Sequence, residues 1–448
     1  MCNGTIMDKL ISFSLPLMLS GILQLMFNAV DIIVVGRFSG SQALAAVGST
    51  SALINVFTNL FIGISLGANV LTARFYAAGR EKEVSETVHT AITLALVSGI
   101  VMALVGLVFS RGALALMGTP DDVIGLSALY MRIYFLGMPF FMLYNYGAAI
   151  LRAVGDTKRP LLFLMIAGVI NACLNMVLVI VFKLGVAGVA IATVISQMIS
   201  CVLVLRCLCR SESSYRLRFS ELGMKGYYLK QIFSVGVPAG IQSTVINFSN
   251  VLLQSSVNSF GSTAMAGYTA ANNLLGFLYV SVNSITQACM SFTSQNYGVG
   301  KLKRMDRVLA DCMILSVVVA VVLGCICYGF GPEILQIYTE DAEVIACGME
   351  ILAYTTITYF LCGWMDLFPG ALRGMGYSAV PMVLSVIGTV GTRVVWIFGI
   401  FPYPRSLAIL FISYPASWII TIVLQVICFY FVRRRVHRRS QALAGQEA

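Results

Sequence analysis

Long apolar runs, separated by short polar segments, set the strongest limit on how this chain can fold. Each run is long enough to cross the roughly 30 Å hydrocarbon core of a bilayer as an α-helix. Backbone N–H and C=O groups in lipid must be paired, and a helix pairs them within its own segment. The sequence therefore predicts twelve transmembrane helices, near residues 10–35, 44–73, 87–110, 123–151, 160–182, 186–205, 231–258, 264–296, 308–331, 342–371, 379–401 and 406–432.

Composition excludes a soluble protein. Hydrophobic residues make up 58% of the 448 residues and charged residues only 11%, whereas soluble domains carry roughly a quarter charged residues. A soluble fold of this size could not cover so much apolar side chain with polar surface. The first run, Leu10 to Val35, is long enough to remain in the membrane, so we expect an integral multi-pass protein without a cleaved signal peptide.

The net charge of +10 is distributed unevenly about the predicted helices. Most of the 29 Lys and Arg residues fall in the two termini and in alternate loops. The positive-inside rule then places both termini in the cytoplasm of a cell (plasma or inner) membrane. The basic tail is expected to contact anionic lipid rather than nucleic acid. Four basic residues lie on the opposite side: Arg37, Arg111, Lys183 and Arg405.

The chain also repeats itself. Shifted by 221 residues, Leu151–Gly155 aligns with Leu372–Gly376, and Tyr76–Lys82 aligns with Tyr297–Lys303. An even number of helices per repeat makes the two repeats parallel, related by a pseudo-two-fold axis along the membrane normal. The predicted fold is therefore an all-α membrane protein of two six-helix bundles.

Three segments follow from this division. Residues 1–210 form the first bundle, 211–228 a cytoplasmic linker, and 229–448 the second bundle with its basic tail. Two such bundles usually enclose a central cavity, and rocking them gives alternating access. A duplicated fold without transport is the alternative.

Ionisable residues inside membrane helices are costly and therefore suggest function. Asp31 lies near the outer end of the first predicted helix. Asn171 and Asn175 share a helix face at i, i+4, and Thr193 lies in the outer part of the next helix. These four residues are the predicted H⁺ or Na⁺ site, and they would be the metal ligands if Na⁺ is the ion, because hard cations prefer oxygen. Alternatively, Asp31 is an interfacial residue that faces water.

The second half differs from the first. Asp366 aligns with Asn145, so one half has an acid where the other has an amide. Both are secondary site candidates, and the alternative is that Asp366 secures the backbone near an expected helix break at Pro369–Gly370. Arg132 and Arg393 also fall inside apolar runs, where we expect structural pairing or snorkelling.

Catalytic motifs are not found in the sequence. It contains no GxxxxGK[ST] phosphate-binding loop, and its two histidines, His89 and His437, lie near predicted cytoplasmic ends. Its twelve cysteines lack metal-site spacing. We expect neither an enzyme nor a cofactor. Ion movement is a sufficient drive, since one charge crossing 100 mV supplies about 2.3 kcal/mol, or about fifty-fold in concentration.

Four segments, taken in order, resemble the multidrug and toxic compound extrusion (MATE) family. The resemblance implies an antiporter that exports amphipathic, often cationic, compounds in exchange for H⁺ or Na⁺. It implies that Asp31, Asn171, Asn175 and Thr193 match the family's cation site and that Pro16 matches its bending proline in helix 1. The segments are Val30–Gly36, Leu151–Thr157, Gly185–Thr193 and Leu372–Gly376.

Two departures accompany the resemblance. Many members carry an acid where this chain has Asn175, and some carry a glutamate within the stretch that corresponds to Ile241–Leu253. A flippase for lipid-linked saccharides is the alternative function, and a channel is a further one. The expected partners are small organic substrates and the lipid bilayer, and the protein is expected to be monomeric.

Overall fold

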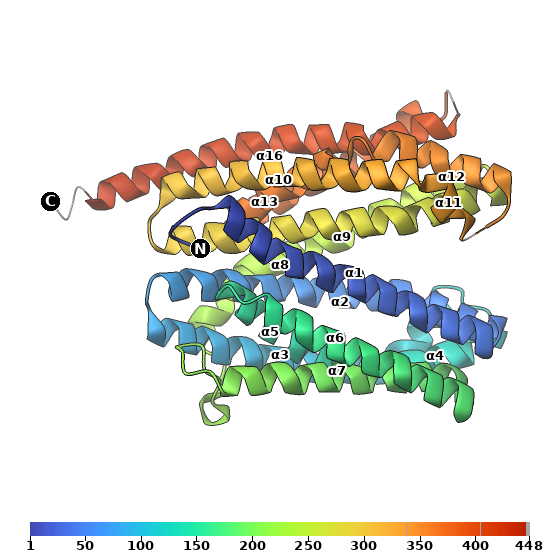
Figure 1. Cartoon of the computed structure of the whole chain (residues 1–448), viewed down its shortest axis with the longest axis horizontal. Coiled ribbons are helices and arrows are strands. Elements are labelled where there is room, and N and C mark those ends of the chain that lie inside the picture. Colours follow the sequence, from blue (N-terminus) through green and yellow to red (C-terminus); the bar gives the residue numbers. More distant parts are fainter. Residues whose placement is uncertain (338, 404, 445–448) are drawn as a thin grey trace. The chain divides into compact units, whose positions relative to one another are not determined.

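The structure, a computed structural model, describes residues 1–337, 339–403 and 405–444. Helices make up nearly all of this part of the chain, and no strand occurs in it, which confirms the predicted all-α class (Figure 1). The helices are α1 (Met7–Phe38), α2 (Ser41–Ala77), α3 (Glu81–Leu116), α4 (Asp121–Leu136), α5 (Met138–Ala153), α6 (Lys158–Asn175), η1 (Met176–Val181), α7 (Gly185–Cys209), η2 (Phe219–Glu221), α8 (Gly226–Asn258), α9 (Ser262–Gly298), α10 (Leu302–Gly329), α11 (Gly331–Gln336), α12 (Ala342–Thr355), α13 (Tyr359–Gly374), α14 (Ala379–Ser385), η3 (Val386–Gly391), α15 (Thr392–Val395), η4 (Trp396–Ile400) and α16 (Leu407–Ala444).

Membrane-spanning capacity is spread along the whole chain. Within the described residues, eight helices are long and apolar enough to cross a bilayer, and the number rises to ten if each of two bent helix pairs is one span. The remaining long helices, α8 and α9, have 33 and 37 residues and carry more polar side chains. Each predicted run lies on one of these stretches, and the total of twelve crossings stays a prediction.

Two runs predicted as continuous helices are bent. Residues 123–151 form α4 and α5, which meet at 47°, and residues 342–371 form α12 and α13, which meet at 51°. The first bend lies at Gly137, where Pro139 near the start of α5 removes a backbone donor. The second follows Thr355 and Thr356, whose hydroxyls donate to carbonyls one turn back, a contact that often bends helices. The break expected at Pro369–Gly370 is wrong, since α13 continues through it.

The contacts divide the chain into two compact units, and their boundaries fall inside helices. One unit is Leu19–Gly240, and the other comprises Met1–Met18 and Ile241–Ala448. The boundaries therefore lie in α1, two residues after Pro16, and in α8, two residues after Pro238. These units group residues by packing, whereas the division at 211–228 separates the sequence repeats and stays a prediction.

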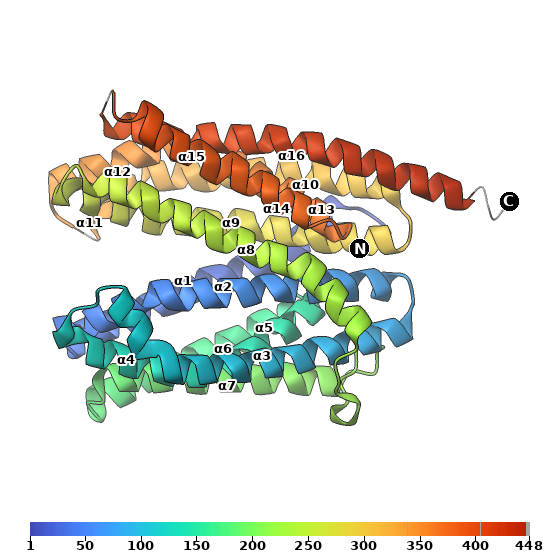
Figure 2. The ribbon, with the colours of Figure 1, turned by 180° about the vertical axis from the view of Figure 1, so that it is seen from behind.

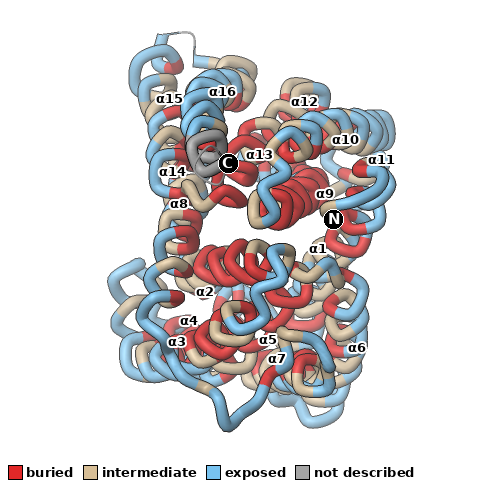
Figure 3. The backbone as a smooth tube through the Cα atoms, turned by 90° about the vertical axis from the view of Figure 1, so that its left-hand side faces the viewer, coloured by how far each residue is buried: buried red, intermediate tan, exposed pale blue. Residues whose placement is uncertain are grey.

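Corresponding helices pack in the same way within each unit. In Leu19–Gly240, α5 contacts α2, α3 and α7; in the other unit, α13 contacts α9, α10 and α16. Figure 3 shows α9 buried along most of its length, consistent with its contacts to α10, α12 and α13. The turns correspond too: Gly79 and Gly300 both have positive φ, at 69° and 73°, where a side chain would be strained. The repeat is therefore visible in the conformation of the turns as well as in the packing of the helices.

The loops predicted to be cytoplasmic meet at one end of each unit. In Leu19–Gly240, the backbone N–H of Arg218, in the linker, donates to Nε2 of His89 near the start of α3 at 3.0 Å. In the other unit, Arg433 near the end of α16 donates to both carboxylate oxygens of Asp306 at 2.7 and 2.6 Å. These contacts agree with the predicted alternation of loops. Which side of the membrane this end faces stays a prediction.

Candidate functional site

A chain of polar side chains connects three helices in the unit Leu19–Gly240. Asn175, the last residue of α6, donates through Nδ2 to the Asp31 carboxylate of α1 and to Asn171 Oδ1, the latter at 3.0 Å. Asn171 Nδ2 in turn lies 3.5 Å from Ser196 Oγ on α7. The structure therefore brings together three of the four residues predicted to form the site.

In the described part of the chain, the hydrogen-bond partner of the Asp31 carboxylate is a neutral amide. Asn171 and Asn175 are buried, and Asp31 is half-buried. Across the described part of the chain, no Lys, Arg or His forms an ion pair with Asp31. Asn175 Oδ1 is also buried, and no described residue donates to it. A carboxylate beside a buried amide oxygen without a donor fits a proton or a small cation.

The fourth predicted residue, Thr193, lies outside this chain of hydrogen bonds. Its hydroxyl donates to the carbonyl of Val189 on its own helix at 3.0 Å. Ser196, one turn further along α7, makes the contact to Asn171 and donates to the Thr193 carbonyl at 2.8 Å. Thr193 as an ion ligand stays a prediction. Ser196 was missed, although its position at i+3 from Thr193 on the same helix face could have indicated it.

A glycine brings α1 and α6 close together at this site. A Cβ placed on Gly168 would lie 1.8 Å from Cε2 of Phe27, far inside van der Waals contact. Phe27 precedes Asp31 by one turn of α1, and Gly168 precedes Asn175 by two turns of α6. The same contact between helices therefore holds Phe27 against Gly168 and Asp31 against Asn175. Sequence reasoning did not identify Gly168, although its spacing places it on the face of Asn171 and Asn175.

A π-helical segment follows directly. Asn175 precedes η1, which spans Met176–Val181. Single π-helical turns are rare in proteins and occur frequently at functional sites. The polar chain is thus placed where α6 leaves regular geometry.

Comparisons with known proteins identify the family of this chain. The MatE family model matches residues 16–177 and again residues 238–398, so it matches twice and covers most of the chain. The chain belongs to the MatE family.

Relatives and solved structures extend that result over the full length. The chain is 32% identical to "Probable multidrug resistance protein YoeA" of Bacillus subtilis (strain 168), over 94% of this chain and 93% of the relative. It is 22% identical to "Multidrug export protein MepA" of Staphylococcus aureus (strain NCTC 8325 / PS 47), over 86% and 85%. An outward-facing multidrug resistance MATE family transporter of the MOP superfamily superposes with a TM-score of 0.88 at 20% identity, covering 97% of both chains.

Family membership confirms the resemblance found in the sequence, and it makes this chain a multi-pass membrane transporter of MATE fold. Structures of a MATE protein in the bent and in the straight conformation both superpose with a TM-score of 0.87, at 19% and 20% identity. The first covers 98% of both chains and the second covers 97% of both. At these identities the likeness establishes the fold alone.

The secondary candidates in this MATE family member occupy different surroundings. Asn145 donates to the carbonyl of Phe141 on its own helix at 2.8 Å. Asp366 is half-buried on α13 within electrostatic reach of Arg373, whose Nη2 donates to Gln242 at 2.6 Å. The aligned positions are therefore not equivalent in contact, and neither adjoins the polar chain around Asp31 in the hydrogen bonds of the described residues.

Pro16 and Arg132 lie in simpler settings. Pro16 is buried inside α1, which runs through it without interruption. Arg132 is exposed on α4, which suits the predicted snorkelling.

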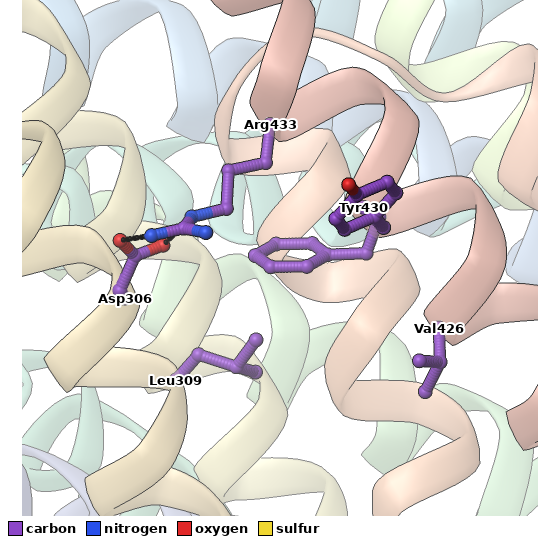
Figure 4. A pocket seen from close by; sticks show the side chains of 6 residues that line it. Asp306, Leu309, Val426, Tyr430 and Arg433 are labelled. Carbon is purple, nitrogen blue, oxygen red and sulfur yellow. Dashed lines mark hydrogen bonds and ion pairs between the residues drawn. The ribbon is translucent and has the colours of Figure 1, made fainter. Parts of the chain in front are cut away.

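A separate groove lies between α10 and α16 (Figure 4). Its volume is about 300 Å³, and apolar side chains form most of its wall. Arg433 closes one end and is already held by Asp306. None of the residues predicted to form the site lines it. Its lining is Asp306, Leu309, Val426, Phe429, Tyr430 and Arg433.

Proposed function

We propose that this MATE protein is a secondary active antiporter that exports amphipathic or cationic organic compounds in exchange for H⁺ or Na⁺. Family membership supports transport, and the names of the relatives YoeA and MepA associate their proteins with multidrug resistance and export. We place the protein in the cell membrane as a monomer with both termini in the cytoplasm. The positive-inside distribution of Lys and Arg supports that orientation.

One observation carries the proposal: the Asp31 carboxylate is held by Asn175 inside an apolar helix bundle, with no basic partner among the described residues. A carboxylate in such surroundings gains from binding a proton or a cation. The oxygens of Asp31, Asn175 and Asn171 can approach a Na⁺ ion, whereas a proton needs only the carboxylate. Thr193 is kept as a further proposed ligand.

Coupling of ion binding to transport requires that ion binding change the position or conformation of a helix. When Asp31 takes up the ion, its charge is neutralised and the hydrogen bond from Asn175 changes strength. We propose that α1 then shifts near Pro16. Two observations support this step: the boundary between the packing units lies two residues after Pro16, and a MATE protein of the same fold exists in bent and straight conformations. Substrate is released outward in this step and is reloaded after the return to the inward-facing state.

The test is ethidium transport in proteoliposomes of the purified full chain under an imposed pH gradient or an imposed Na⁺ gradient. Wild type is expected to move ethidium against its gradient with one of the two ions. Asp31→Asn keeps the shape of the side chain but removes the carboxylate that would bind the proton or Na⁺, so coupled transport should be lost. Asp122→Asn makes the same change at an exposed position of α4 and should transport like wild type.

The outcomes separate the candidate functions. Full ethidium exchange by Asp31→Asn, at equal protein incorporation, would show that the mechanism is wrong. Movement of lipid-linked saccharides without dependence on either ion would favour the flippase, and an uncoupled ion conductance would favour a channel.

A further inference from the structure

Arg393 is a buried cation in the unit that contains Ile241–Ala448. It lies on α15, a single turn of α-helix between the π-helical segments η3 and η4, and only 3% of it is exposed. Its Nη1 donates to Asn250 Oδ1 at 2.7 Å and approaches Ser249 Oγ at 3.4 Å. The guanidinium carbon also lies 4.8 Å from the ring centre of Tyr414. Figure 2 shows the three helices that supply these residues, α8, α15 and α16.

Among the residues that the structure describes, the guanidinium of Arg393 has no counter-ion. Within the described residues, no carboxylate lies within 4.0 Å of Arg393, and its Nε is buried with no acceptor. Buried cations in membrane proteins are costly and are usually paired with an acid. An amide oxygen, a hydroxyl and an aromatic face are weaker partners for a guanidinium than a charged acceptor. Arg393 therefore has unused capacity for an anion.

The cluster around Arg393 and the site around Asp31 lie on corresponding helices of the two repeats. The site around Asp31 is built on α1, α6 and α7, and the cluster around Arg393 is built on the corresponding helices of the second repeat. With the shift of 221 residues, Asn171 aligns with Thr392, next to Arg393, and Thr193 aligns with Tyr414. Arg393 itself aligns with Ala172, and Asp31 aligns with Leu252, so the two charges lie at different positions on corresponding sets of helices. The first set carries an acid and the second set a base.

Asn250 is the exposed member of this cluster, whereas Ser249 and Arg393 are buried. An anion would therefore approach Arg393 past Asn250. An anion that displaces Asn250 Oδ1 would meet Nη1 of Arg393, the Ser249 hydroxyl and the Asn250 amide N–H groups, all of which can donate. The flanking π-helical segments add to this, because such irregular turns are frequent at functional sites.

We propose that Arg393, Asn250 and Ser249 form a binding site for a monovalent anion. Two sources share this chemistry: the carboxylate of an organic compound and a free halide such as chloride. The inference depends on no ion gradient and no export activity, so it stands or fails separately from the proposed antiport.

The experiment measures the thermal unfolding of the purified full chain while benzoate or sodium chloride is titrated at constant ionic strength, held with sodium sulfate. A ligand that binds only the native state raises the unfolding temperature in a saturable way. Wild type is expected to show such a rise with at least one anion. Benzamide, the uncharged analogue of benzoate, should give none.

Three variants assign the effect to the site. Arg393→Gln should lose the anion-dependent rise, whereas Arg405→Gln, which removes an exposed cation of the same unit, should keep it. Asn250→Asp places a carboxylate next to the guanidinium. That variant should unfold at a higher temperature without added anion and should no longer respond to either anion.

Each outcome decides a point. A rise with both anions supports a site open to free halide, and a rise with benzoate alone supports an organic carboxylate. An equal rise in wild type and Arg393→Gln, or no saturable rise with either anion, would overturn the proposal. If Arg393→Gln does not fold, an undiminished response in Asn250→Asp overturns it as well.

Discussion

Replacing Gly168 by alanine adds a single methyl group at the contact between α1 and α6, and it should disturb the Asp31 site from a distance. The added Cβ would lie 1.8 Å from Phe27 Cε2, 2.0 Å from Cζ and 2.5 Å from Cδ2, against an ordinary contact of 3.4 Å or more. The nearest ring atom has to move away by roughly 1.6 Å, the difference between 1.8 and 3.4 Å, to reach ordinary van der Waals contact. Because Phe27 and Asp31 share a face of α1, this movement should pull Asp31 from Asn175.

The magnitude follows from overpacking. An extra methyl group in a packed interior typically costs about 1–3 kcal/mol. In the absence of a clash, replacing a glycine in a helix interior by alanine stabilises the protein by about 0.5–1 kcal/mol. We therefore expect Gly168→Ala to lower the unfolding temperature. It should also slow ethidium exchange, and by more than the loss of stability alone would cause.

Two variants make the comparison specific. Gly112→Ala introduces the same methyl group on α3, where no atom lies within 4 Å of the new Cβ, so it should keep or raise stability. Phe27→Leu shortens the opposing side chain and should restore exchange when combined with Gly168→Ala. If Gly168→Ala matches Gly112→Ala in both unfolding temperature and exchange rate, the contact does not position Asp31.

Three further changes test other parts of the structure. Gly236→Ala would place a Cβ 2.4 Å from the Ile64 Cα. Because a backbone atom cannot rotate away as a side chain can, thermal unfolding should show a loss of stability of about 1–3 kcal/mol or more. An unchanged unfolding temperature would contradict the close crossing of α2 and α8 at these residues. Pro16→Ala restores a backbone donor in α1 and should keep stability while it slows ethidium exchange; unchanged exchange would argue against a hinge there. A hydrogen bond from Arg218 lowers the pKa of Glu221 below its ordinary 4.5. The pair therefore stabilises the folded linker at pH values above the pKa that Glu221 has in the unfolded chain. This stabilisation is lost as the pH falls through the lower pKa that Glu221 has in the folded protein. A carboxyl ¹³C titration should give that lower pKa, and Arg218→Gln should return it to the ordinary value.

Periodicity and hydropathy identified the helices because both follow from local sequence. The spacing of Asn171 and Asn175 placed them on one face, and the structure shows them joined to Asp31. The bend between α4 and α5 could have been expected from Pro139. The bend after Thr356 could not, because its hydroxyl acts only once the helix has formed. Pro369 shows the reverse case, in which a helix continues through a proline.

The remainder of the site depends on contacts between helices, which one sequence does not specify. Gly168 is unremarkable until Phe27 lies against it, and Ser196 becomes significant only because Asn171 reaches α7. The sequence predicts structural pairing or snorkelling for Arg393. The structure gives it an amide, a hydroxyl and a ring, and that absence of an acid among the described residues could only be seen in three dimensions.

The boundaries of the packing units inside α1 and α8 have a consequence for biosynthesis. The unit Leu19–Gly240 is complete only after the ribosome has passed the linker and made the start of α8. The other unit contains Met1–Met18, the first segment made, which must wait for Ile241 and the residues beyond it. A gene cut at residues 211–228 would therefore leave each fragment without a helical segment supplied by the other. Co-insertion of both fragments, rather than sequential folding of two independent bundles, should be needed to assemble the protein.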